Sequence, residues 1–409
     1  MFKIDDIKLR IIKDSRGQDT LEVFMKEGKI EVTSSVPQGK SRGEREAVFI
    51  DPQKALEQFQ SLKPFLIKQK FETLADFDNF LLRIDNTPQK SVLGGNLTLV
   101  LSQGYSKLLA RLEKVPLWEF LRNNLIELMP ASQSFICTDP YPYFFLNLIN
   151  AGRHAPYGPK FQEYLIVPRE ENPEKALEIA KTFFFHLKNF MQDRYGKVEF
   201  GDEGGVLVNT EDYTLPLEIL TSLRSRLKLD NVLSFSLDIA ASSFFDSTSQ
   251  TYQINHEKSV TKEELLDIYQ NLQKKYQLLS WEDPFDENDF SSFTQLNNLF
   301  QKQAVVIGDD LTTTNYQYVQ KSLEQNAISG LIIKPSQIGT ISETLKVIAL
   351  AYEKNLKFIV SHRSAETDDD FISDLAFGCC AWGLKAGAPQ PKERMVKYNR
   401  IIQIITHKT

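Results

Sequence analysis

A lysine directly follows a short apolar run in the second half of the chain. Lys334 comes after Leu331, Ile332 and Ile333, and Pro335 marks the start of a turn. Such a run predicts a buried strand with the lysine at its carboxyl end. Desolvation there would lower the pKa of the amine and make Lys334 a base near neutral pH. The alternative is an ordinary rim lysine whose ammonium group reaches water.

Other apolar runs in this half of the chain also end in reactive side chains. Their ends carry acids, a histidine, an arginine and a second lysine: Asp238, Glu282, Asp309, His362, Arg363 and Lys385. Segments with helical periodicity separate these runs, at 262–276, 316–326, 341–355 and 370–380. Alternating strands and helices are typical of βα units that close into a barrel, where the carboxyl ends of the strands meet at one mouth. We therefore expect these side chains and Lys334 to face a common pocket.

Three of these residues are acids from successive strand ends. Asp238, Glu282 and Asp309 would offer only oxygen donors, which selects a hard cation and favours Mg²⁺. Three unpaired carboxylates would repel one another, so the alternative is structural ion pairing with Lys334 or Lys385.

A further carboxyl group stands apart from these three. Glu203 lies among the glycines of segment 201–205, where the backbone can bring a carboxylate close to a ligand. An ordinary solvated turn is the alternative. A metal, a lysine base and a separate acid suggest removal of a proton next to a carboxylate, with Lys334 abstracting and Glu203 protonating a leaving hydroxyl. Arg363 beside Ser364 suits a phosphate, so the expected substrate is a phosphorylated hydroxy acid.

The segment 36–44 reads as a loop. Gly39 and Gly43 flank Lys40, Ser41 and Arg42. Such a loop could close over an anion as a lid or offer the Ser41 oxygen to a metal, and the alternative is a plain surface loop.

The first third of the chain has a different pattern. Residues 4–36 alternate as strands do, and segments 52–70, 72–82, 96–112 and 117–125 have helical periodicity. We expect a three-stranded antiparallel sheet backed by helices, which makes residues 1–128 a smaller α+β domain. A proline-broken stretch then leads into the barrel domain, 129–409, whose first strand is predicted at 143–150. The predicted fold class is α/β.

Length and composition set outer limits. The 409 residues exceed one barrel, and 42% hydrophobic with 25% charged residues indicates a globular chain. The net charge of -6 argues against a nucleic-acid-binding surface. Without a signal core or a membrane-length apolar run, we expect no membrane association and a cytoplasmic location. The chain has an odd number of cysteines, Cys137, Cys379 and Cys380, and their spacing is not that of a metal site. Two of them are adjacent in the sequence and would seldom form a disulfide with each other, so the cysteines favour a reducing compartment.

Taken together, these motifs resemble the enolase family over nearly the whole chain. The resemblance rests on segments 14–17, 150–154, 201–205, 236–242, 281–286, 308–312, 361–364, 387–389 and 397–399, on Gln162, Glu163, Lys334 and Lys385, and on the loop around Ser41. It implies reversible, Mg²⁺-dependent dehydration of 2-phosphoglycerate to phosphoenolpyruvate in glycolysis and gluconeogenesis. It also implies an α+β amino-terminal domain on a β/α barrel whose first units depart from strict alternation.

The resemblance also implies a role for each site residue. A first Mg²⁺ would lie on Asp238, Glu282 and Asp309, and a second would arrive with substrate at Ser41. Lys334 would be the base, Glu203 the acid with Glu163 supporting it, and Lys385 would stabilise charge at the substrate carboxylate. The implied substrate contacts are His154, Gln162, His362, Arg363 and Ser364. Members of the family are usually dimers or octamers of dimers, so a homo-oligomer is implied.

Several positions depart from the family pattern. Lys40 and Arg42 add two cations at the lid, Ser243 stands where a glutamate is usual, Pro335 and Ser336 follow the base in place of Val-Asn, and Ala365 replaces a glycine. None of these removes a residue implied in proton transfer. The alternatives to an active enolase are a paralogue acting on a related acid and a non-catalytic binding protein with the same fold.

Overall fold

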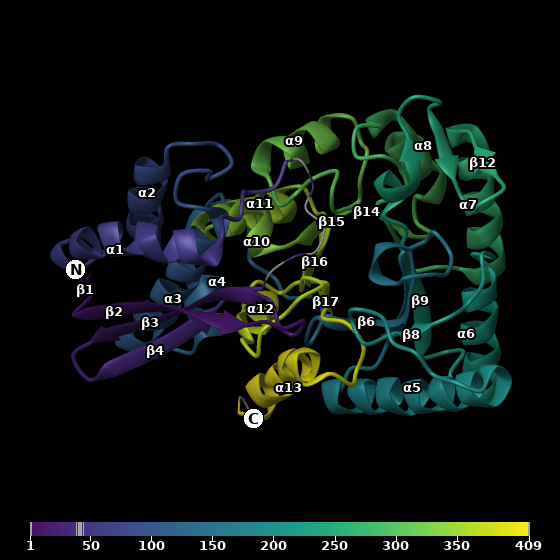
Figure 1. The fold of residues 1–409 in the computed structure, drawn as a ribbon, viewed down its shortest axis with the longest axis horizontal. Coiled ribbons are helices and arrows are strands. Elements are labelled where there is room, and N and C mark those ends of the chain that lie inside the picture. Colours follow the sequence, from purple (N-terminus) through teal and green to yellow (C-terminus); the bar gives the residue numbers. More distant parts are fainter. Residues whose placement is uncertain (1, 38, 40–42, 44, 408–409) are drawn as a thin grey trace.

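The computed structural model describes residues 2–37, 39, 43 and 45–407, and it places a smaller amino-terminal part against a barrel (Figure 1). The predicted α/β class, with a barrel after a smaller α+β part, is confirmed.

The amino-terminal part is a sheet covered by helices. Its antiparallel strands lie in the order β2 (Asp6–Lys13), β3 (Asp19–Glu27) and β4 (Ile30–Ser35), as predicted, and β1 (Phe2–Lys3) pairs with β5 (Lys70–Phe71). The helices are α1 (Pro52–Lys68), α2 (Leu74–Asp85), α3 (Gly95–Leu112) and α4 (Leu117–Leu128). Buried Val23 and Met25 of β3 pack on α3, where a Cβ at Gly104 would lie 2.6 Å from Val23. The close approach of helix and sheet therefore needs a glycine at this position.

The second part is a closed barrel. Its strands are β6 (Tyr143–Asn150), β7 (Glu163–Pro168), β9 (Leu233–Asp238), β13 (Ser280–Glu282), β14 (Val305–Gly308), β15 (Gly330–Ile333), β16 (Lys357–Ser361) and β17 (Gly383–Lys385), with β8 (Val206–Leu207) attached to β6. The pairing of β17 with β6 closes the sheet. Strand β7 is antiparallel to β6 and β9, whereas β9 and the following barrel strands pair in parallel. The departure from strict alternation that the resemblance implied is therefore present.

Helices surround the barrel (Figure 1). They are α5 (Pro173–Tyr195), α6 (Leu215–Arg226), α7 (Lys262–Tyr276), α8 (Phe290–Phe300), α9 (Tyr316–Glu324), α10 (Pro335–Ile338), α11 (Ile341–Glu353), α12 (Phe371–Gly378) and α13 (Lys392–Thr406). A small antiparallel sheet is formed by β10 (Phe245–Asp246), β11 (Thr251–Gln253) and β12 (Ser259–Val260). A separate apolar cluster, including Phe145, Ile332 and Trp382, comes from barrel strands and the residues beside them. It fills the inside of the barrel, so the polar strand ends lie above a packed core.

A buried carboxylate joins the two parts. Asp369, between β16 and α12, accepts hydrogen bonds from the Ser35 backbone N–H at 2.8 Å and the Lys107 ammonium at 2.7 Å. Ser35 ends β4 and Lys107 lies on α3, so the amino-terminal sheet and helix are both fixed to the loop that follows the mouth.

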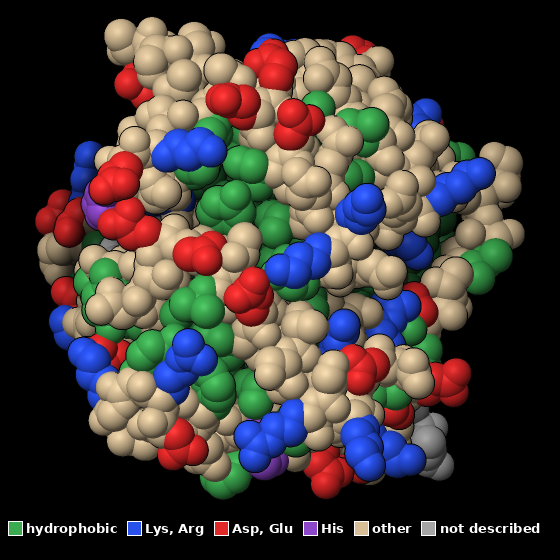
Figure 2. Space-filling view, turned by 90° about the vertical axis from the view of Figure 1, so that its right-hand side faces the viewer, with side chains coloured by type: hydrophobic (Ala, Val, Ile, Leu, Met, Phe, Trp, Pro, Cys, Tyr) green, Lys and Arg blue, Asp and Glu red, His purple; other side chains and the backbone are tan. Residues whose placement is uncertain are grey.

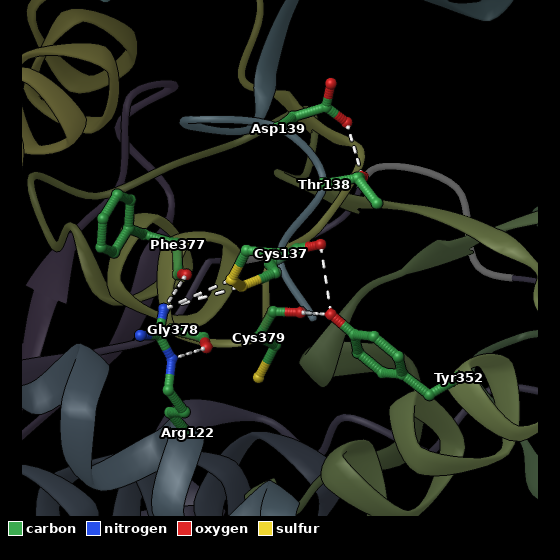
Figure 3. Close-up of a disulfide and its surroundings, with 9 residues drawn as sticks. Arg122, Cys137, Thr138, Asp139, Tyr352, Phe377, Gly378 and Cys379 are labelled. Atoms are coloured by element: carbon green, nitrogen blue, oxygen red, sulfur yellow. Dashed lines mark hydrogen bonds between the residues drawn. A yellow bond between two sulfur atoms is a disulfide. The ribbon is translucent and has the colours of Figure 1, made fainter. Parts of the chain in front are cut away.

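Cys137 and Cys380 form a disulfide, and Cys379 is free and buried (Figure 3). This bond was not predicted from the sequence, in which pairing was considered only for the adjacent Cys379 and Cys380 and a reducing compartment was favoured. The reason is physical: the two half-cystines are 243 residues apart, and only the closed barrel brings them together.

The outer face beside α6, α7 and α8 carries lysines and arginines interspersed with acids, with apolar side chains between them (Figure 2). Both signs of charge therefore share this face. Within the described part of the chain, no helix combines the length and the apolarity needed to cross a membrane.

Candidate active site at the barrel mouth

The strand ends bring the predicted side chains together. One cavity at the mouth is lined by predicted residues, namely His154, Gln162, Glu163, Glu203, Asp238, Asp309, Lys334, His362, Arg363, Ser364 and Lys385, and also by Glu46, Arg153, Ala240, Asp283, Asp310 and Ser361. Its volume is only about 50 Å³, because ion pairs fill most of the mouth. Glu282 is buried beside this cavity at the end of β13 and faces Asp238 across the strand pairing.

Lys334 is held by Asp309. Its ammonium donates to Asp309 Oδ2, and the Gln337 side-chain amide donates to the other carboxylate oxygen at 2.9 Å. Burial acts to lower the pKa of Lys334, but the Asp309 carboxylate outweighs it and raises the pKa above its ordinary value. The expectation of a lowered pKa is therefore wrong for this arrangement, because apolar burial was considered without the carboxylate that accompanies the lysine.

Lys385 lies within ion-pair distance of three acids. Its ammonium lies 2.8 Å from Asp238 Oδ2, 2.8 Å from Glu282 Oε2 and 3.1 Å from Glu163 Oε2. Burial alone would lower the pKa of Lys385, but these carboxylates raise it well above the usual range. Burial and the neighbouring Asp238 raise the pKa of Glu282 in turn. The ion pairs with Lys334 and Lys385 that the sequence raised as an alternative are therefore present, and the metal site stays a prediction.

Two carboxyl groups and two imidazoles form a second cluster. His154 Nδ1 lies 3.4 Å from Glu163 Oε1 and 3.6 Å from Glu203 Oε1, and His362 Nε2 lies 3.4 Å from Glu203 Oε1. Burial, and then the charge of Glu203, raise the pKa of Glu163 well above its ordinary value. Burial opposes ionisation of Glu203 as well, but His362, His154 and Arg394 hold its pKa low. The two carboxyl groups therefore titrate as a coupled pair, and Glu163 is the member whose pKa is raised.

Arg363 is paired with a residue that the sequence analysis did not single out. Its guanidinium donates to Glu46 at 2.6 Å (Nη1 to Oε2) and 3.3 Å (Nη2 to Oε1), and Nη1 also donates to Ser336 Oγ at 3.2 Å. Glu46 follows the predicted lid and belongs to the amino-terminal part. A Cβ on Gly39 would lie 2.3 Å from Arg363 Nη2, so a larger residue at this position would have to displace the guanidinium.

Other supporting residues were also missed. Asn147 donates to Glu203 Oε2 at 3.0 Å, and Arg394 of α13 contacts His362 Nδ1 and donates to the Ser364 carbonyl oxygen at 2.8 Å. Asp283 accepts the backbone N–H groups of Asp309 and Asp310 at 2.8 and 2.6 Å. Asp283 could have been identified from the sequence, because it directly follows the predicted metal ligand Glu282. The local sequence gave no comparable signal for Asn147 or Arg394, because their partners are remote in the chain.

The donor set at the mouth fits a hard divalent cation, because the predicted metal residues offer buried carboxylate oxygens whose charge lysines now neutralise. Among the described residues, donor atoms lie within 4.8 Å of one another in two groups, His154 with Glu163 and Glu203, and Asp283 with Asp309 and Asp310. The predicted set of Asp238, Glu282 and Asp309 is not one of these groups, since Lys385 lies between its first two members. Ser41, Lys40 and Arg42 lie outside the described residues.

Both parts of the chain match models of the same protein family. Residues 138–407 match the family model "Enolase, C-terminal TIM barrel domain", and residues 4–121 match "Enolase, N-terminal domain". The enolase of Sulfurisphaera tokodaii is 36% identical, with 98% of this chain and 95% of the relative covered. The enolases of Saccharolobus solfataricus and Methanocaldococcus jannaschii are each 34% identical to this chain. Each match covers 98% of this chain, and it covers 96% of the Saccharolobus protein and 95% of the Methanocaldococcus protein. The chain belongs to the enolase family.

Proposed function

We propose that Lys334 and Glu203 are the base and the acid with which this enolase-family hydro-lyase interconverts 2-phosphoglycerate and phosphoenolpyruvate. The observation that carries the proposal is the meeting of two lysines, an arginine and the Glu163–Glu203 pair in one buried cavity at the barrel mouth. These groups match the demands of the reaction, which removes a proton next to a carboxylate and then expels a hydroxyl.

Lys334 takes the proton from the carbon between the carboxylate and the phosphate ester. The charge that develops on the carboxylate is stabilised by Lys385, whose ammonium is held at the mouth by Asp238, Glu282 and Glu163. Glu203 then protonates the hydroxyl on the next carbon, which leaves as water. Glu163, the neighbouring carboxyl whose pKa is raised, supports Glu203 in this step.

Substrate contacts follow from the remaining groups in the cavity. Arg363 and Ser364 bind the phosphate, and His154, Gln162 and His362 line the path between phosphate and carboxylate. An anionic substrate would replace Glu46 and the other carboxylates as partner of these cations. The small cavity volume supports this exchange, since the mouth must rearrange to admit the substrate.

The family implies a divalent metal, for which we propose two Mg²⁺ ions per site. Asp238, Glu282 and Asp309 would hold the first, and Ser41 would contribute to the second as substrate binds. When bound, such cations supply positive charge that stabilises the dianionic intermediate and offsets the carboxylates that now keep the lysines protonated.

Further proposals concern the assembly, the location and the domain boundary. We propose a homo-oligomer, either a dimer or an octamer, and a cytoplasmic location. We also place the boundary between the two domains after residue 128, supported by the end of α4 at Leu128 and by the irregular stretch that follows it. Light scattering of the purified chain would test the oligomer.

A pair of variants separates the two proton-transfer roles. Glu203→Gln should lose dehydration, seen as ultraviolet absorbance of phosphoenolpyruvate, by about 10²–10⁴-fold, yet keep exchange of the substrate proton with deuterated solvent. Lys334→Ala should lose both reactions, and removal of metal with EDTA should abolish turnover reversibly. Lys107→Ala is the matched control, because Lys107 also pairs with an aspartate and its side chain is 17% exposed against 15% for Lys334. Proton exchange that survives in Lys334→Ala would reject Lys334 as the base.

A further inference from the structure

The disulfide joins two segments that are far apart in the sequence. Cys137 lies in the irregular stretch between α4 and β6, and Cys380 lies in the turn between α12 and β17. Their Cα atoms are 5.3 Å apart, within the usual range for disulfides. Cys137 is exposed and Cys380 is partly buried. A small solute can therefore reach Cys137 more readily than Cys380.

An arginine lies directly against both sulfurs. Arg122 Nη2 is 3.6 Å from Cys380 Sγ and 3.9 Å from Cys137 Sγ. The same guanidinium donates to the carbonyl oxygens of Gly378 and Phe377 at 2.9 and 3.2 Å, which fixes its position beside the bond (Figure 3). These two hydrogen bonds therefore hold the arginine side chain in place beside the disulfide.

Arg122 forms no ion pair in the described part of the chain, and the charge of Glu119, one turn earlier on α4, acts on it from beyond ion-pair distance. Within the described part of the chain, no carboxylate lies within ion-pair distance of it, and its neighbours are the rings of Trp118, Phe135 and Phe377 at 5.0, 5.4 and 6.0 Å. Burial lowers the pKa of Arg122, yet a guanidinium keeps its proton at any physiological pH. A positive charge beside a neutral disulfide contributes little, whereas beside a thiolate it is strongly stabilising.

The third cysteine shows the contrast within the same turn. Cys379 is fully buried and free, and burial raises the pKa of its thiol to about 12. Such a thiol is inert toward exchange. Thiol chemistry in this chain is therefore confined to the pair beside Arg122.

We propose that Cys137 is a thiol-exchange site, at which low-molecular-weight thiols and disulfides are added and released, with Arg122 holding the Cys380 thiolate that leaves. The site is separate from the barrel mouth and does not depend on the proposed function. It would make the bond between the linker and the barrel responsive to the surrounding thiol pool.

The exchange balances in two steps. An external thiolate attacks Cys137 Sγ, forms a mixed disulfide there and expels Cys380 as a thiolate beside Arg122. A second external thiolate attacks the mixed disulfide, so that two external thiols are oxidised to one disulfide and both cysteines are reduced. A leaving thiolate of low pKa departs faster, which is the contribution expected of Arg122.

Glutathione is the probe for the test. The full-length chain is equilibrated at several ratios of reduced to oxidised glutathione, quenched with acid and unfolded, and its free thiols and mass are measured. We expect one free thiol at the oxidising end and three at the reducing end. Cys380→Ser should carry one glutathione at Cys137, whereas Cys137→Ser should carry far less because Cys380 is partly buried.

Variants of the arginine test its part in the exchange. Arg122→Gln should slow reduction of the disulfide by about tenfold, and Arg122→Lys should restore much of the rate. Arg224→Gln is the matched control, since Arg224 also stacks on a ring and donates to a carbonyl oxygen but contacts no sulfur in the described structure. If Arg122→Gln does not fold, alkylation of the reduced wild-type chain replaces it. Half-maximal alkylation of Cys380 should then lie below the ordinary thiol value of about pH 8.5.

Three free thiols at every glutathione ratio would overturn the exchange site. An unchanged reduction rate in folded Arg122→Gln, or an ordinary alkylation midpoint, would overturn the role of Arg122.

Discussion

At the scale of single residues, the mouth is a set of cations that each hold a carboxylate. Lys334 pairs with Asp309, Lys385 with Asp238, and Arg363 with Glu46. These pairs keep several buried charges stable, because an unpaired buried charge costs several kcal/mol. An anionic substrate must therefore displace these carboxylates from the cations. The strength of each internal ion pair then contributes to the free-energy cost of substrate binding.

Glu46 offers the clearest test of this exchange. Its carboxylate holds the guanidinium of Arg363 through both terminal nitrogens, so the substrate phosphate must displace Glu46 to bind Arg363. Glu46→Gln should then lower KM by about tenfold, with a smaller effect on kcat, because a neutral amide competes less strongly for the guanidinium in the ground state and in the transition state alike. Steady-state kinetics with 2-phosphoglycerate measures both constants.

The matched control is Asp374→Asn. Asp374 forms a similar two-pronged pair with Arg400, at 2.7 Å on each side, between α12 and α13. Its loss should reduce stability and leave KM unchanged. A higher KM in Glu46→Gln would show that Glu46 positions Arg363 for the phosphate and does not compete with it.

At the scale of elements, the sequence predicts strand ends better than the contacts between them. The runs before Asp238, Glu282, Asp309 and Lys334 were identifiable because parallel barrel strands are apolar and end abruptly in polar residues. Glu46 was not identifiable, since nothing in its own segment shows that it meets Arg363, 317 residues later. The pKa of Lys334 was mispredicted for the same reason, because its sign depends on Asp309 across the barrel.

Helix α2 carries a buried acid whose titration should control stability. Asp78 Oδ2 accepts the Ser342 backbone N–H at 2.9 Å at the start of α11, and its Oδ1 has no hydrogen-bond partner among the described residues. Burial raises the pKa of Asp78 from its ordinary 3.8 to about 6. Between these values the unfolded chain releases a proton that the folded chain keeps, so the free energy of unfolding should fall as the pH rises from about 4 to about 6.

Asp78→Asn removes the charge and keeps an oxygen acceptor for Ser342. Its free energy of unfolding should exceed that of the wild type by about 2 kcal/mol near pH 8, and the difference should disappear near pH 4. Urea denaturation at both pH values measures this. Asp369 serves as the control, because the opposite change in the free energy of unfolding is expected for it. Burial tends to raise its pKa, but Lys107 and the bonded N–H groups lower it overall, so Asp369→Asn should destabilise the protein at neutral pH. A variant Asp78→Asn that is less stable at both pH values would contradict the assignment.

At the scale of the whole molecule, the amino-terminal part and the barrel are joined by polar contacts and by one covalent bond near their junction. Asp369 and Asp78 each connect the two parts, and Arg122 of α4 donates to the carbonyl oxygens of Phe377 and Gly378 at the end of α12. The disulfide adds a link between the stretch that follows α4 and the turn that leads into β17. The mouth and this junction are therefore connected through the last βα unit of the barrel.

The disulfide closes a loop that contains nearly the whole barrel, so its reduction should be visible in global stability. Cross-linking residues 243 apart removes entropy from the unfolded chain, and the loop-closure relation gives a stabilisation of about 5 kcal/mol as an upper value. The reduced wild type should therefore unfold at a lower urea concentration than the oxidised protein. Cys379→Ser should retain this dependence on reductant, because Cys379 takes no part in the bond, whereas Cys137→Ser should unfold at the lower concentration with or without reductant. Equal midpoints for the oxidised and reduced wild type would mean that this bond does not constrain the unfolded chain, and the link between linker and barrel would then rest on the polar contacts alone.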